Sequence, residues 1–194
     1  HDAEIKIMNE LMPDYVGFVF YGKSRRFISP EHAAYLRAKL KRGIKSVGVF
    51  KNAALEAVAL SVETVGLDLV QLHGDETGEY IAALREYIKC PIIRRFRIAS
   101  SMDADRAMYT TADYVMLDGG AAGMSFDWSM IGTSRRRRFF LKGGITPDNV
   151  EQALNITPAP YALDVSTGVE SGMLKDYRKV MKFIQAVRSH KTRN

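Results

Sequence analysis

Cysteine is nearly absent from this chain. Cys90 is the only cysteine in 194 residues, so no disulfide can form within the chain. A lone thiol is typical of proteins kept in a reducing cytoplasm, and we expect that location here. Cys90 also precedes the strand predicted at residues 92–97, on the side away from an active site, so we interpret it as a structural residue.

Long apolar runs are absent as well. No stretch approaches the ~18 consecutive apolar residues of a membrane span. The opening His1-Asp2-Ala3-Glu4 is polar and no small-residue cleavage site follows it, so no signal peptide is visible. We therefore expect a protein without a membrane partner.

The charge of the chain leans to the positive side. A net charge of +6 favours anionic ligands such as phosphates and carboxylates, and it could also favour nucleic acid. Residues 135–138 are four consecutive arginines, the pattern that most invites a nucleic-acid interpretation. This run lies just before the strand predicted at residues 139–142 and has no interleaved aromatic residues. We interpret it as a solvated charge run and expect no nucleic-acid partner.

Strands and helices alternate along the chain. Apolar runs of strand length occupy residues 14–20, 45–50, 68–72, 92–97, 114–118, 139–142 and 161–165. Apolar residues at helical spacing occupy residues 3–11, 30–42, 53–65, 76–89, 103–109, 147–154 and 175–187. Such alternation indicates βαβ units and a parallel sheet. Ser29 and Asp75 are expected to cap the starts of two of these helices.

A parallel sheet can be open and doubly wound, or closed into a barrel. A G-x-G-x-x-G fingerprint after the first strand would favour the open sheet, and the chain has none. Polar and glycine-rich residues instead follow the strand ends, at Tyr21-Gly22-Lys23, His73-Gly74-Asp75, Asp118-Gly119-Gly120, Gly143-Gly144 and Ser166-Thr167-Gly168. A barrel builds its active site on that face. We therefore predict a single α/β domain over residues 1–194, a (β/α)8 TIM barrel.

The predicted strands are one too few for that barrel. Seven strands would leave two unpaired edges. The helix at residues 3–11 comes before the first of them, although a helix in this alternation normally follows a strand. We therefore expect a further strand ahead of residue 1, so that the sequence is truncated at its N-terminus.

Two glycine-containing loops indicate a phosphate site. They follow the strands at residues 139–142 and 161–165, and in this fold the last two loops often bind phosphate through backbone N–H groups. Glycine lets the backbone approach the anion closely, although it can also serve only to make a tight turn. We expect phosphate binding at Gly143, Gly144, Ser166, Thr167 and Gly168.

Taken in order, these motifs resemble those of the phosphoribosylanthranilate isomerases. The matching runs are residues 17–20, 23–30, 47–52, 70–76, 117–118, 123–128, 142–145 and 164–170. Each run is weak alone, but together they cover residues 14 to about 176 in the right order and on the right strands.

The resemblance implies an Amadori rearrangement in tryptophan biosynthesis. A general acid protonates the furanose ring oxygen of N-(5'-phosphoribosyl)anthranilate, the ring opens to a Schiff base, and a general base removes the C2′ proton to give the carboxyphenylamino-deoxyribulose phosphate. The chemistry needs no metal and no redox cofactor.

The resemblance makes Asp118 the general acid, against the alternative that it only caps the turn that follows it. A carboxyl that donates at neutral pH must be partly protonated, which apolar surroundings favour. The family's base is a cysteine in a Lys-Ile-Cys-Gly-like motif at the end of a strand. The sequence lacks that motif, and Cys90 does not match it.

Substrate contacts are implied for three more residues. Arg26 matches the arginine that pairs with the anthranilate carboxylate, and Arg25, where the family often has proline, is the adjacent competitor. Asp164 could bond a sugar hydroxyl or cap a turn, and His73 could line the pocket or serve as a hydrogen-bonded structural histidine. Asp127 is expected to cap a helix start and not to act as an acid.

Two other functions stay open. One is another phosphate-binding barrel enzyme such as indole-glycerol-phosphate synthase, whose lysine motifs have no match here. The other is a non-catalytic barrel or fragment that keeps the phosphate site but lacks the general base. In each case we expect a monomer or a homodimer.

Overall fold

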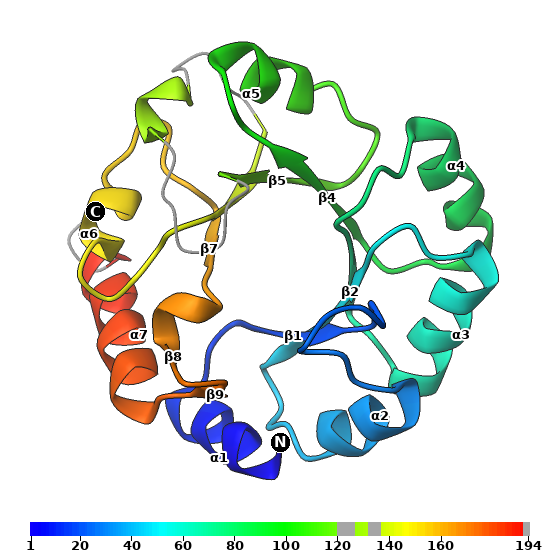
Figure 1. The fold of residues 1–194 in the computed structure, drawn as a ribbon, viewed down its shortest axis with the longest axis horizontal. Coiled ribbons are helices and arrows are strands. Elements are labelled where there is room, and N and C mark those ends of the chain that lie inside the picture. The colour runs from blue at the N-terminus through cyan, green and yellow to red at the C-terminus, as the bar shows by residue number, and fades with distance from the viewer. Residues whose placement is uncertain (120–126, 132–136, 192–194) are drawn as a thin grey trace. The chain divides into compact units, whose positions relative to one another are not determined.

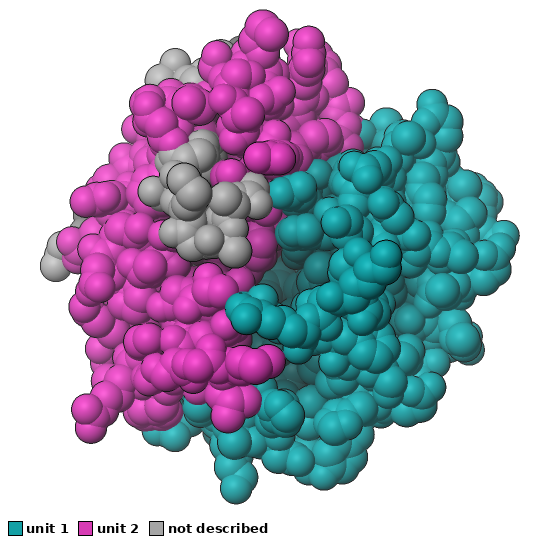
Figure 2. Space-filling model, in the orientation of Figure 1, with its two compact units in different colours: residues 1–95, 111–113 teal, residues 96–110, 114–194 magenta. Residues whose placement is uncertain are grey.

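The computed structural model describes residues 1–119, 127–131 and 137–191 (Figure 1). The chain divides into two compact units, coloured separately in Figure 2. Unit 1 comprises His1–Arg95 and Thr111–Asp113, and unit 2 comprises Phe96–Thr110 and Tyr114–Asn194. Strands and helices alternate in both units, so the predicted α/β class is confirmed, while closure into a barrel stays a prediction.

Unit 1 is built from parallel strands, each followed by a helix. Its elements are α1 (Asp2–Leu11), β1 (Tyr15–Val19), α2 (Pro30–Ala38), β2 (Lys45–Phe50), α3 (Leu55–Val65), β3 (Leu69–Leu72), α4 (Gly78–Tyr87) and the first part of β4 (Ile92–Arg97). The strands pair in chain order, with Val19 opposite Val49 and Phe50 opposite Leu72. The parallel pairing aligns the carboxyl ends of these strands along one edge.

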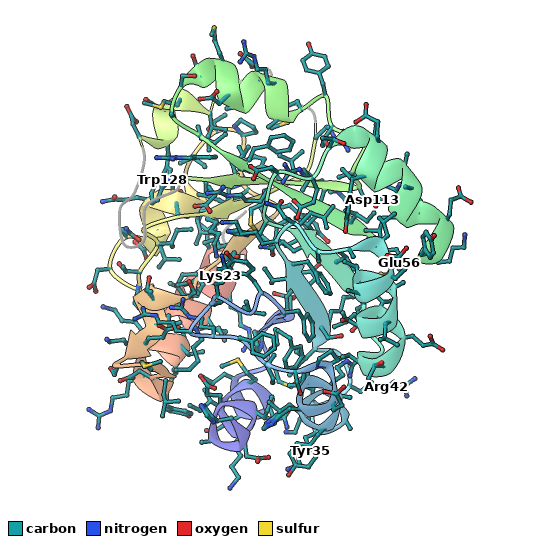
Figure 3. The ribbon with its side chains drawn as sticks, turned by 45° about the vertical axis from the view of Figure 1, so that its right-hand side comes forward. Lys23, Tyr35, Arg42, Glu56, Asp113 and Trp128 are labelled. Atoms are coloured by element: carbon teal, nitrogen blue, oxygen red, sulfur yellow. The ribbon has the colours of Figure 1, made fainter. Side chains whose placement is uncertain are left out.

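The core of unit 1 lies between these strands and helices. Val58, Val70, Leu72 and Ile92 are fully buried, which explains why the strands are almost continuously apolar. Figure 3 shows Tyr35 projecting outward from α2, where it is 52% exposed.

Unit 2 repeats the same alternation. It contains the end of β4, α5 (Ser101–Ala107), β5 (Tyr114–Asp118), the 3-10 helix η1 (Trp128–Met130), β6 (Phe139–Lys142), α6 (Val150–Leu154), β7 (Ala162–Asp164), the 3-10 helix η2 (Thr167–Val169), β8 (Glu170–Ser171), β9 (Leu174–Lys175) and α7 (Tyr177–Lys191). Strands β5, β6 and β7 pair in parallel in that order. The antiparallel pair β8–β9 is a feature that the sequence does not predict, because each strand has only two residues.

Several helix boundaries differ from the prediction. The predicted cap Asp75 is wrong: α4 begins at Gly78, and the hydroxyl of Thr77 accepts the N–H of Tyr80 at 3.3 Å. Helix α6 begins at Val150 and not at residue 147, because the Asn149 amide holds the preceding residues in a turn. The predicted cap Ser29 is confirmed by its bond from the His32 N–H.

None of the helices in the described ranges is long and apolar enough to cross a membrane.

Candidate active site

Three ionisable side chains stand in one row at the carboxyl ends of β5, β6 and β7. Asp118 is in register with Lys142, and Lys142 is in register with Asp164. In-register residues of neighbouring parallel strands are ~4.8 Å apart and point to the same face of the sheet. Lys142 Nζ donates to Asp164 Oδ2 at 2.8 Å. The structure therefore brings the predicted acid Asp118 and the predicted substrate-binding residue Asp164 onto one face, together with a lysine that the prediction did not single out.

Asp118 is buried at the end of an apolar strand. It is 6% exposed, and Val115, Met116 and Leu117 before it are buried too. Its carboxyl lies over the backbone of the next loop, because a Cβ atom at Gly143 would be 3.2 Å from Asp118 Oδ1. Its carbonyl accepts the Ile98 N–H at 2.9 Å. An acid held in this setting is shielded from bulk water on the side of the strand.

The loop after β6 presents backbone donors. Gly143 and Gly144 have φ angles of 106° and 64°, a region that favours glycine. Within the described part of the chain, neither of their N–H groups donates to a protein acceptor. Successive N–H groups in such a turn form a concave site for an anion.

The loop after β7 packs directly on the loop after β6. A Cβ atom at Gly168 would lie 2.0 Å from the Ile145 carbonyl oxygen, so only glycine fits. Ser166 precedes η2, and the first N–H groups of a helix have no partner within it. Gly168 is thus packed against the residues that directly follow Gly143 and Gly144.

A lysine clamp holds the second of these loops. Lys175 Nζ donates to the Ser166 carbonyl at 3.0 Å and to Glu170 Oε1 at 2.8 Å. Lys179 Nζ donates to the Glu170 carbonyl at 2.7 Å. These bonds from β9 and α7 fix the backbone of the loop.

Arg26 lies in the loop between β1 and α2 of unit 1. Its N–H donates to Ser24 Oγ at 3.1 Å, and the loop is closed by the Ile28 N–H, which donates to the Val19 carbonyl at 3.0 Å. Arg26 is half-buried whereas Arg25 is exposed. This difference favours Arg26 over Arg25 as the arginine that is held in place for a carboxylate.

His73 follows β3 and is hydrogen-bonded. Its Nδ1 lies 2.9 Å from Nε2 of the buried Gln71, and its N–H donates to the Phe50 carbonyl at 2.8 Å. The histidine therefore has the structural contacts of one predicted alternative, and its role toward substrate stays a prediction.

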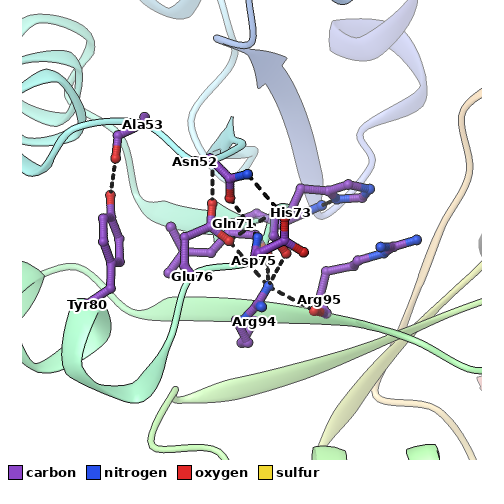
Figure 4. A network of polar contacts seen from close by, with 11 residues as sticks. Asn52, Ala53, Gln71, His73, Asp75, Glu76, Tyr80, Arg94 and Arg95 are labelled. Carbon is purple, nitrogen blue, oxygen red and sulfur yellow. Dashed lines mark hydrogen bonds and ion pairs between the residues drawn. The ribbon is translucent and has the colours of Figure 1, made fainter.

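A buried ion pair joins the loops after β2 and β3 to the middle of β4 (Figure 4). Arg94 Nη1 lies 3.3 Å from Glu76 Oε2, and the Glu76 side chain is 1% exposed. Glu76 also accepts the N–H groups of Asn52 at 2.7 Å and Gly74 at 2.9 Å. Burial lowers the pKa of Arg94, and the Glu76 charge opposes that effect. The three arginines of the strand Ile92–Arg97 were the signal in the sequence for this network.

Tyr80 of α4 lies beside the same network and bonds the residue after Asn52. Its hydroxyl donates to the Ala53 carbonyl at 3.0 Å. Burial, with the charge of Glu76, raises the Tyr80 pKa to about 12. The tyrosine therefore acts at neutral pH as a neutral donor that ties the loop after β2 to α4.

The remaining predicted residues have structural contacts. Cys90 is half-buried against the core of unit 1, and burial raises the pKa of its thiol. Asp127 accepts the Ser129 N–H at 2.9 Å, so its capping role is confirmed. Arg137 donates to the Met108 carbonyl at 3.3 Å, and Arg138 lies 5.2 Å from the centre of the Tyr161 ring.

Other parts of the predicted motifs lie outside the described residues: Gly120, residues 123–126, and residues 135 and 136 of the arginine run. Over the ranges that the structure describes, no three His, Cys, Asp or Glu side chains are grouped as a metal site.

Comparison with known proteins decides the family. A family model described as N-(5'-phosphoribosyl)anthranilate (PRA) isomerase matches residues 1–186. This chain belongs to that family. The N-(5'-phosphoribosyl)anthranilate isomerase of Caldanaerobacter subterraneus is 38% identical over 192 residues, which cover 95% of this chain and 92% of that protein. The resemblance predicted from the motifs is therefore confirmed.

Solved structures of the family match this fold along nearly the whole chain. The phosphoribosylanthranilate isomerase of Thermotoga maritima has a TM-score of 0.86 and 36% identity, with 97% of this chain and 93% of that chain covered. A phosphoribosylanthranilate isomerase in complex with reduced 1-(o-carboxyphenylamino)-1-deoxyribulose 5-phosphate has a TM-score of 0.84 and 35% identity, with the same coverage.

Proposed function

We propose that the protein is a phosphoribosylanthranilate isomerase that converts N-(5'-phosphoribosyl)anthranilate to the carboxyphenylamino-deoxyribulose phosphate in tryptophan biosynthesis. Membership of the isomerase family supports this activity. The observation that carries it is the buried Asp118 at a strand end, directly beside glycine loops with backbone donors for a phosphate.

Asp118 is the general acid of this proposal. Its carboxyl protonates the ring oxygen as the C1′–O bond breaks, and the nitrogen lone pair forms the Schiff base. The C2′ proton then leaves to a general base, and the electron pair moves into the enamine that becomes the ketose. By resemblance to the family, the base is a cysteine on a strand ahead of α1, which would also be the eighth strand of a closed (β/α)8 barrel comprising the whole domain.

The substrate is held at both ends. The phosphate binds backbone N–H groups of Gly143, Gly144 and residues 166–168, and the fork of Arg26 pairs with the anthranilate carboxylate. Asp164 accepts a bond from a sugar hydroxyl, and His73 lines the pocket. The half-burial of Arg26 and the contact between the two glycine loops support these roles.

The working state that we propose is a cytoplasmic monomer or homodimer. It uses acid and base groups of the protein alone, without a metal or redox cofactor, so a chelator should leave its rate unchanged. Its partner is the phosphosugar substrate, not a nucleic acid or a membrane.

A turnover assay tests the proposal. The protein, made with its natural N-terminus, is mixed with phosphoribosylanthranilate. Turnover is followed by the fall in the fluorescence of the substrate, and the product, which has the same mass as the substrate, is separated from it by chromatography. We expect isomerase turnover and binding of the reduced product analogue. Binding of the analogue without turnover would favour a non-catalytic barrel or an indole-glycerol-phosphate synthase. Neither binding nor turnover would favour a different phosphosugar enzyme.

A further inference from the structure

Lys142 stands between two carboxyl groups in the row at the ends of β5, β6 and β7. It is in register with Asp118 on one side and with Asp164 on the other. Its ammonium group bonds Asp164 Oδ2 at 2.8 Å, with 20% of the lysine side chain and 29% of the aspartate side chain exposed. The pair is thus open to a ligand but is still partly shielded from water.

The floor beneath this row is apolar. Met116 and Phe140 lie two residues before Asp118 and Lys142 on the same strands, so they share the same face, and they are 1% and 4% exposed. Charges near such a surface interact more strongly than in water.

Strand β4 is the other neighbour of Asp118. The end of β4 lies beside the end of β5, because the Ile98 N–H donates to the Asp118 carbonyl. Its last residue, Arg97, is exposed, so solvent screens its charge. Arg95, two residues earlier on the same face of β4, is half-buried and lies further from the end of the strand. From β6 and β7 the charged groups in the row are Lys142 and Asp164.

An unpaired ammonium beside Asp118 would favour the ionised carboxylate, which cannot donate a proton. An unpaired Asp164 carboxylate would have the opposite effect on Asp118. In the ion pair the two charges offset each other, so the pair adds little net charge beside Asp118.

We propose that Lys142 is a positioning residue of the isomerase: its ammonium group holds the Asp164 carboxylate for a sugar hydroxyl, and the neutral pair keeps Asp118 able to donate. The inference rests on the proposed function, because it assigns Asp118 the role of the acid. It adds Lys142 to the site. It also predicts that removing the charge of Lys142 and removing the charge of Asp164 shift the pH dependence of kcat in opposite directions.

The test is the pH dependence of kcat in Lys142→Met and Asp164→Asn. The alkaline limb of kcat reports loss of the proton from the general acid. We expect this limb to move to higher pH in Lys142→Met and to lower pH in Asp164→Asn, each by about one pH unit. Both variants should also have a higher KM for the substrate. In Lys142→Met the Asp164 carboxylate is no longer held in place, and in Asp164→Asn residue 164 is no longer charged. Lys142→Arg keeps the positive charge, so its alkaline limb should stay at the wild-type pH.

The chain offers a matched control in Lys182→Met. Lys182 Nζ bonds Asp148 Oδ1 at 2.6 Å in the same unit, but both side chains are mostly exposed. Its removal should leave the pH profile unchanged. Lys142→Gln repeats the test with a polar side chain if the methionine variant does not fold.

The outcomes separate the two proposals. A wild-type protein without isomerase turnover would overturn the proposed function, and this inference with it. An active wild type in which Lys142→Met and Asp164→Asn shift the limb in the same direction, or not at all, would overturn this inference alone.

Discussion

Gly168→Ala tests the geometry of the phosphate site most sharply. The new Cβ atom would lie 2.0 Å from the Ile145 carbonyl oxygen. An ordinary carbon–oxygen contact is about 3.3 Å, so the loops after β6 and β7 must part by about 1.3 Å. The obstacle is backbone and not the end of a flexible side chain, so rotamer changes cannot relieve it.

The size of the effect follows from that displacement. Misplacing a substrate by about 1 Å can cost roughly a hundredfold in rate, and overpacking typically costs about 1–3 kcal/mol of stability. We expect kcat/KM to fall roughly a hundredfold, mainly through a higher KM. Steady-state kinetics measure kcat and KM, calorimetry measures binding of the reduced product analogue, and a denaturant titration measures the loss of stability.

The control is Gly78→Ala, at the start of α4. Nothing lies within 4 Å of a Cβ atom there, and its φ is not positive. That variant should keep wild-type kinetics and stability, or gain a few tenths of a kcal/mol from helix propensity. If Gly168→Ala bound the analogue as tightly as Gly78→Ala does, the two loops would not form the phosphate site.

Three further predictions concern binding and stability. Arg26→Ala should weaken substrate binding by about 2–3 kcal/mol, or roughly a hundredfold, and Arg25→Ala far less; equal effects in titrations of the two variants would refute the assignment. Inorganic phosphate at a hundred times its Kd should stabilise the protein by about 2.7 kcal/mol in a melting assay, and an anion found in crystals only away from Gly143-Gly144 and residues 166–168 would contradict the site. Asp68→Asn should destabilise the protein at neutral pH, as measured by urea titration. Burial raises the pKa of Asp68, but hydrogen bonds from Ser46 and Arg37 outweigh burial and hold this pKa below its usual value. Because the stabilisation of a carboxyl with a lowered pKa is lost as pH falls, the difference from wild type should shrink below about pH 4, and a constant difference would show that the charge is not its cause.

The strands could be predicted closely because their signal is local. Seven apolar runs gave β1 to β7 to within a residue or two, as with residues 68–72 for β3 (Leu69–Leu72). Helix starts were harder, since Thr77 and Asp75 are both good caps and only the geometry selects Thr77. The chain direction of each strand then placed Asp118 and Asp164 at one edge.

The relations between strands could not be predicted from the sequence. The register that sets Lys142 between Asp118 and Asp164 is a property of pairing across the sheet. In the sequence, Lys142 stands out only as the residue before Gly143-Gly144. The Glu76–Arg94 pair joins the loop after β3 to β4, and the sequence does not show which carboxylate the arginines of β4 meet.

The most direct measurement of the central claim compares Asp118→Asn with the wild type, both with their natural N-terminus. The substitution keeps the shape of the side chain but removes the proton that the carboxyl would donate. We predict that kcat falls by about 10²–10⁴ while binding of the reduced product analogue is unchanged. An Asp118→Asn enzyme that turns over phosphoribosylanthranilate at a near wild-type kcat would contradict the account, because the acid would then be another residue.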